Sequence, residues 1–152
     1  KAHALGVGGI FSVDLGGKSG LPGLGPYHAT LKVLALSDGR FSFSGAMYAG
    51  ARAEIGPTAL LKIVDDTADV CVVVGSKRCQ CLDRAIFTHI GIELKKLKII
   101  ALKSTVHFRD DFESIAERIL HAEAPGANYC RLDDVPYQKL RPKVRRSPPT
   151  NI

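Results

Sequence analysis

The 152-residue chain has no tryptophan and a single methionine, but its most informative absences concern membranes. No apolar run approaches the roughly 20 residues that a membrane-spanning helix needs. The N-terminus has no basic segment followed by an apolar core and small residues, so it does not resemble a signal peptide. These absences predict a cytoplasmic protein without a membrane partner.

Complete metal-binding patterns are also missing. The five histidines form no His-Glu-x-x-His and no His-x-His arrangement. Cys79 and Cys81 form one close pair, but no second close pair of Cys or His follows them, as a structural zinc site requires. We therefore expect no metal site and no cofactor within this chain alone. The four cysteines lack the spacing of a disulfide framework, which indicates reduced thiols, and Cys71 in the apolar run 70–74 is expected to be buried.

Positive charge is concentrated at one end of the chain. The net charge is +6, from 21 basic and 15 acidic residues, but residues 139–152 hold five basic residues and no acid. The remainder is therefore only +1 (16 minus 15). This distribution predicts one domain over residues 1–142 and a flexible Pro-rich tail over 143–152, and it argues against nucleic acid as a partner. The alternative function is a small binding module whose tail contacts nucleic acid or acidic proteins.

The apolar pattern changes along the chain from strand-like to mixed. A helix end closed by Gly6 is followed by expected strands at 10–15, 27–36, 40–44, 51–55, 58–64 and 70–75, with hairpin turns at 37–39 and 65–69. The second half predicts a short helix at 82–89, a buried strand at 97–102, a helix that continues to Leu120 and a last strand at 121–124. This order predicts an α/β protein with α+β character in its first half. Its mixed sheet would have antiparallel hairpins followed by a β-α-β-α unit.

The first candidate site follows the expected strand at 97–102. Ligands in open α/β sheets usually bind at the carboxyl ends of strands, where this chain carries Lys103, Ser104, His107 and Arg109. The cationic members favour an anionic or carbonyl group on the ligand. Ser104 with Lys103 or His107 also has the residue types of a nucleophilic pair. Because a serine before a helix is more often a cap, an independent Ser-dependent hydrolase is the weaker hypothesis.

A second candidate is the glycine-rich segment around Gly17 and Lys18. It differs from a phosphate-binding loop, because that motif needs a glycine where this chain has Ser12, and a helix where it has Pro22. A Gly-Gly-Lys turn still exposes backbone N–H groups and an ammonium to an anion. The simpler interpretation is a tight turn with an exposed lysine.

Several short segments share an order and spacing that extends over residues 5–142. They are residues 5–8, 15–18, 34–41, 45–47, 55–59, 83–87, 91–92, 102–104, 107–109, 124–126 and 136–142. Together they resemble the C-terminal domain of the microcystinase C (MlrC) family of zinc metallopeptidases. The basic tail differs from the short apolar and acidic ending that is usual in that family.

The resemblance implies a parent enzyme in two parts. An N-terminal domain of the same polypeptide would hold zinc and most of the peptide-cleaving machinery. This chain would follow it as an accessory domain that shapes the substrate cleft or a subunit interface and cleaves nothing alone. The expected partners are therefore that catalytic domain and, as a further option, a second copy in a homo-oligomer. If the domain reaches the active site, Lys103, Ser104, His107 and Arg109 would position a substrate or anion, with Gly17 and Lys18 second.

Overall fold

The computed structural model describes residues 1–18, 20, 23–64, 67–104, 106–124, 129 and 131–146. The chain divides into two compact units. The first comprises Lys1–Asp14 and His28–Ile119, and the second comprises Leu15–Tyr27 and Leu120–Ile152. The single domain expected over residues 1–142 stays a prediction. Residues 147–152 of the expected tail lie outside the described part, as do Asp65, Asp66 and Cys130.

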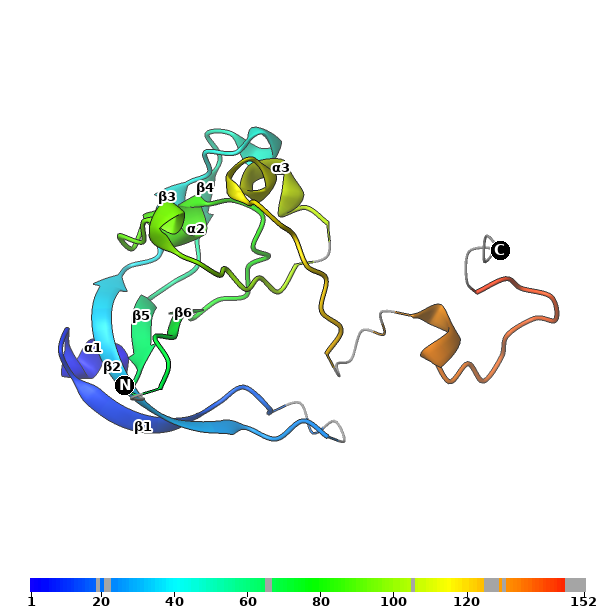
Figure 1. Ribbon diagram of the computed structural model, residues 1–152, viewed down its shortest axis with the longest axis horizontal. Coiled ribbons are helices and arrows are strands. Elements are labelled where there is room, and N and C mark those ends of the chain that lie inside the picture. Colours follow the sequence, from blue (N-terminus) through cyan, green and yellow to red (C-terminus); the bar gives the residue numbers. More distant parts are fainter. Residues whose placement is uncertain are drawn as a thin grey trace. The chain divides into compact units, whose positions relative to one another are not determined.

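Four strands form the larger sheet within the described residues, in the order β1-β2-β5-β6 (Figure 1). They are β1 (Ile10–Leu15), β2 (Tyr27–Ser37), β5 (Thr58–Ile63) and β6 (Cys71–Gly75). Strand β5 runs antiparallel to both β2 and β6. The strands predicted at 10–15, 27–36, 58–64 and 70–75 are confirmed, as is the predicted β5–β6 hairpin. With the short helices they confirm the α/β class.

The central strands β2 and β5 carry much of the apolar core. Leu31 and Val33 on β2 are fully buried, and Val33 is paired with the buried Leu61 on β5. Side chains of this size each contribute about 1.5–3 kcal/mol when they are removed from water. The first unit therefore has a rigid sheet to which its loops are attached.

A second sheet continues the first. Strands β3 (Arg40–Ser42) and β4 (Arg52–Glu54) are antiparallel, and their register begins with Arg40 opposite Glu54. The β2–β5 pairing ends with Ser37 opposite Thr58, so the two pairings form one long ribbon that bends between them. The tip of this ribbon is the loop at 43–51, which contains the short helix η1 (Ala46–Tyr48).

The hairpin predicted with its turn at 37–39 is therefore wrong. Those residues form the bend of the ribbon, where the Gly39 N–H donates to Ser37 Oγ at 3.0 Å and the Arg40 N–H donates to Asp38 Oδ1 at 3.0 Å. These local bonds satisfy the backbone at the bend, so the chain continues into a second sheet instead of reversing direction.

The described helices are all short. They are α1 (Ala2–Leu5), α2 (Ala85–Thr88) and α3 (Arg109–Phe112), with the 3-10 turns η2 (Leu94–Lys96), η3 (Glu113–Ile115) and η4 (Leu132–Asp134). The predicted helix end at Gly6 is confirmed, with a φ of 76° at that glycine. The helix predicted at 82–89 is confirmed in its second half. Within the described residues, no helix is both long and apolar enough to cross a bilayer.

Three predictions for the second half are wrong. Residues 97–102, all of them described, form no strand, and Ile99 is 85% exposed. Only Ile100 and Leu102 are half-buried, so this segment packs by one side without a ladder of backbone bonds. The expected helix to Leu120 ends after η3, because Leu120 is exposed instead of packed. The described residues 121–124 are exposed and form no strand.

Candidate functional site

Gln80 joins two of the predicted site residues. Its side-chain Nε2 lies 3.0 Å from His107 Nδ1 and 3.5 Å from Ser104 Oγ. The three residues come from two loops, one before α2 and one before α3, and the sequence separations are 27 and 24 residues. Gln80 and His107 are exposed and Ser104 is half-buried, so the cluster is open to a ligand. The sequence prediction missed Gln80, although it lies between Cys79 and Cys81, which were considered as half of a metal site.

The two remaining cations of the first candidate site flank this cluster in sequence. Arg109 begins α3, and its Nη1 donates to Glu113 Oε1 at 2.9 Å. Its guanidinium also lies 5.9 Å from the centre of the Phe108 ring. Lys103 is exposed, on the irregular segment that replaces the expected strand. Arg109 is therefore held by its own helix, whereas Lys103 extends from a loop.

Gly17 and Lys18 belong to the second unit, whereas Ser104 and His107 belong to the first. Gly17 has a φ of 60°, and a Cβ there would lie 2.2 Å from the carbonyl carbon of Gly25 and 2.3 Å from Pro26 N. Close approach of two backbone segments therefore requires glycine at this position. Ser19, Leu21 and Pro22 lie outside the described residues.

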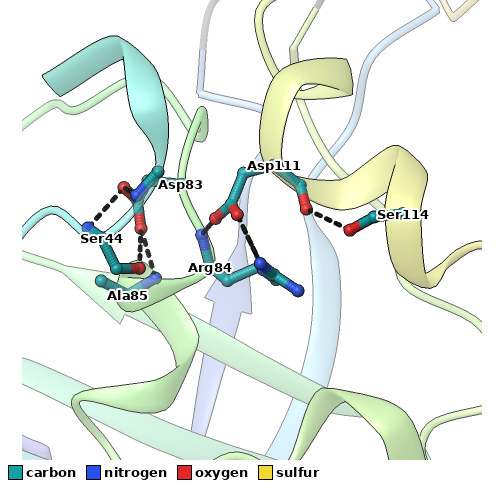
Figure 2. A network of polar contacts seen from close by, with 7 residues as sticks. Ser44, Asp83, Arg84, Ala85, Asp111 and Ser114 are labelled. Atoms are coloured by element: carbon teal, nitrogen blue, oxygen red, sulfur yellow. Dashed lines mark hydrogen bonds and ion pairs between the residues drawn. The ribbon is translucent and has the colours of Figure 1, made fainter. Parts of the chain in front are cut away.

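A buried acidic network lies at the start of α2, and the sequence analysis did not predict it (Figure 2). Asp83 is only 1% exposed. Its Oδ2 accepts the backbone N–H groups of Ser44 at 2.9 Å and Gly45 at 2.7 Å. Its Oδ1 accepts the Ala85 N–H at 2.7 Å and the Ser44 hydroxyl at 3.2 Å. Asp83 thus ties the ribbon tip to the first turn of α2.

A second buried carboxylate, Asp111, ties α3 to the same place. It is 5% exposed, and its Oδ2 accepts the Arg84 N–H at 2.6 Å while its Oδ1 accepts Arg84 Nε at 2.8 Å. Arg84 Nη2 adds an ion pair at 2.7 Å. Gly45 separates the two acids, since a Cβ there would lie 3.2 Å from Asp111 Cγ and 3.2 Å from Asp83 Oδ2. Figure 2 shows that Asp83 is hydrogen-bonded to Ala85 and Asp111 to the adjacent Arg84.

These carboxylates are structural in character. The Asp83 and Asp111 oxygens are already occupied by N–H and O–H donors, which leaves little capacity for a cation. No group of three or more His, Cys, Asp or Glu side chains suited to a metal occurs among the residues that the structure describes. The donor set of the described residues therefore does not fit zinc.

An open groove of about 550 Å³ adjoins the Arg84 end of this network. It is lined by Ser44, Arg84, Thr88, Gly91, Ile92, Glu93, Leu94, Lys95 and Ile115. Its lining mixes apolar side chains with charges of both signs and does not include Ser104 or His107. The groove is therefore distinct from the Gln80 cluster.

The cysteines near the cluster differ in environment. Cys71 is exposed at the start of the edge strand β6, so the prediction of a buried thiol is wrong. Burial raises the pKa of Cys81 to about 12, with further contributions from Cys79 and Asp83. Burial also raises the pKa of Cys79, which is nevertheless exposed.

Alkylation should separate these two thiols. We expect Cys81 to react with iodoacetamide at least about ten times more slowly than Cys79 near neutral pH, because the thiolate is the nucleophile and Cys81 is both less accessible and harder to ionise. Quenched time points analysed by peptide mass spectrometry would give both rates. Equal rates would show that the Cys81 thiol is as open as that of Cys79.

Comparison with known proteins finds a matching protein family and a similar solved structure. The family model described as MlrC C-terminus matches residues 1–139. The chain is also similar to a crystal structure from Mesorhizobium sp. BNC1 named "Putative metallopeptidase", with 25% sequence identity and a TM-score of 0.64. The similarity covers 76% of this chain but only 22% of that chain. No curated protein matches.

Proposed function

Because this chain belongs to the MlrC C-terminus family, we propose that it is the accessory domain of a zinc-dependent metallopeptidase. In this proposal a catalytic domain of the same polypeptide holds the zinc. The present domain helps to shape the substrate cleft or a subunit interface and does not cleave peptides alone. The similarity to the Mesorhizobium protein supports this assignment, since the chain spans about a fifth of that longer protein.

The observation that carries a positioning role is the contact of Gln80 with Ser104 and His107. It holds polar side chains from two distant loops at an accessible surface. Such a surface suits a wall of a cleft, where fixed donors orient a substrate before another group attacks it. Zinc in the catalytic domain would supply an activated water. The residues of this chain would bind and orient the peptide.

Location and assembly complete the proposal. A cytoplasmic location agrees with the free thiols of Cys71, Cys79 and Cys81. A homo-oligomer would be compatible with an interface role. The alternative of a tail that binds nucleic acid has less support, because tail residue Arg146 has its Nε 3.3 Å from Asp133 Oδ1 in an ion pair.

Substitution in the complete polypeptide tests the positioning role. We expect His107→Ala to lower kcat/KM for peptide cleavage roughly 10- to 100-fold, and Lys103→Ala to lower it less, because a misplaced substrate loses reactive geometry. Lys98→Ala is the matched control, since Lys98 is an exposed lysine on the same irregular segment. Unchanged kcat/KM for both site variants, with normal circular dichroism, would remove these residues from the site.

A further inference from the structure

The orientation of the Gln80 amide determines which hydrogen-bonding groups the cluster has left for a ligand. An amide NH₂ group carries two hydrogens and accepts no hydrogen bond, so Gln80 Nε2 can only donate. Its nearest partners are His107 Nδ1 at 3.0 Å and Ser104 Oγ at 3.5 Å. With the amide in this orientation, His107 Nδ1 accepts one N–H, and Ser104 Oγ lies within reach of the other.

If His107 Nδ1 and Ser104 Oγ accept from Gln80, the hydrogens of both side chains remain available for other bonds. A neutral imidazole that accepts at Nδ1 carries its proton on Nε2. A hydroxyl that accepts an N–H keeps its own hydrogen for a further bond. His107 Nε2–H and the Ser104 O–H would therefore both be available as donors.

We propose that Gln80 is a positioning residue that fixes His107 in its Nε2–H tautomer, so that His107 and Ser104 together donate to an oxygen atom of the ligand. The ligand chemistry is a carboxylate or a peptide carbonyl. That the ligand is a peptide substrate rests on the proposed function, whereas the tautomer and its dependence on Gln80 do not.

The same geometry argues against the Ser-dependent hydrolase. A nucleophilic Ser–His pair needs the serine O–H to donate to an unprotonated imidazole nitrogen. In the proposed tautomer Nδ1 receives the Gln80 N–H and Nε2 carries the proton, so neither nitrogen can accept from Ser104. His107 is thus arranged as a donor toward the ligand and not as a base for Ser104.

Nitrogen NMR of the 152-residue chain with ¹⁵N-labelled histidine tests the proposal directly, above the pH range in which imidazoles titrate. The resonances of His107 are assigned by their loss in His107→Ala. We expect the wild-type ring to be mainly the Nε2–H tautomer, Gln80→Leu to give a mixture, and Gln80→Glu to shift it to Nδ1–H, because a carboxylate can only accept. Gln138→Leu is the matched control, since Gln138 is an exposed glutamine whose Nε2 donates to the Pro136 carbonyl.

A wild-type ring found mainly as Nδ1–H, or a tautomer unchanged in Gln80→Leu, would overturn the proposal.

A second measurement titrates the chain with an N-acetylated dipeptide that has a free carboxylate, and with its C-terminal amide. If only the free acid shifts the His107 resonances, the ligand group is a carboxylate. If the acid and the amide both shift them, it is a carbonyl. Gln80→Leu should weaken this binding about fivefold, the effect of one ordinary hydrogen bond.

Absence of both responses in the wild-type chain would overturn the assignment of the two donors to a ligand oxygen. The expected tautomer with unaltered peptidase activity in His107→Ala would instead contradict only the proposed function. The two results are therefore separable.

Discussion

Replacing Asp83 by alanine should lower the free energy of unfolding by about 3–5 kcal/mol, because the donors around its buried carboxylate then lose their acceptor. Asp83 is 1% exposed and accepts backbone N–H groups from Ser44, Gly45 and Ala85. Each unsatisfied buried donor costs about 1–3 kcal/mol. The loss should also release the ribbon tip from α2, since Asp83 contacts both.

Urea unfolding followed by circular dichroism measures this loss. Asp83→Asn separates charge from shape: one amide oxygen replaces one carboxylate oxygen, but the NH₂ group faces donors that it cannot serve. We therefore expect the asparagine variant to lie between wild type and alanine. Asp110→Ala is the matched control, because Asp110 is exposed in α3 and surface changes usually stay within about 0.5 kcal/mol. If Asp83→Ala is no more destabilised than this control, the network does not stabilise the fold.

The sequence was most informative where one short segment determines its own structure. The pattern of apolar residues on both sides of residues 65–69 predicted the β5–β6 pairing, and Gly6 marked the end of α1. It failed at Ser37-Asp38-Gly39, where a local turn signal also fits a bend. Whether a ribbon bends or reverses there depends on pairing with β4 and β5, which are distant in sequence.

The candidate site was predictable only in its residue types. Ser104 and His107 stand out because polar residues follow an apolar run, although that run forms no strand. Gln80 could not be predicted, since its role depends on a contact 27 residues away. The burial of Asp83 and Asp111 could not be predicted either, because an acid in the first turn of a helix is usually solvated at the positive end of the dipole. Long-range packing, which the sequence does not display, converts these acids into buried acceptors.

Gly39→Ala is expected to destabilise the fold by more than about 3 kcal/mol, through two separate costs. Gly39 has a φ of 75°, a conformation that costs a residue with a Cβ about 1–2 kcal/mol. In addition, a Cβ at this position would lie 2.0 Å from the carbonyl oxygen of Gly56. That contact is with backbone, so no side-chain rotation can relieve it.

The bend cannot easily open to admit the methyl group. The Ile55 N–H donates to the Gly39 carbonyl at 3.0 Å, and the strand pairs on both sides of the bend hold the two segments together. Movement of Gly56 away from Gly39 would therefore break backbone bonds beside the buried Ile55. This coupling makes Gly39 a requirement of the ribbon as a whole and not only of a local turn.

Comparison with Gly50→Ala separates the steric cost of Gly39→Ala from its conformational cost. Gly50 lies in the tip of the same ribbon with a φ of 78°, but a Cβ there would have nothing within 4 Å. The free energy of unfolding of Gly50→Ala should therefore fall only by the conformational cost of a positive φ, about 1–2 kcal/mol. Urea unfolding of both variants gives the difference, and equal losses would contradict the close approach of Gly39 to Gly56. A larger loss for Gly39→Ala would instead show that the first unit depends on one continuous bent ribbon, the element whose tip Asp83 ties to α2.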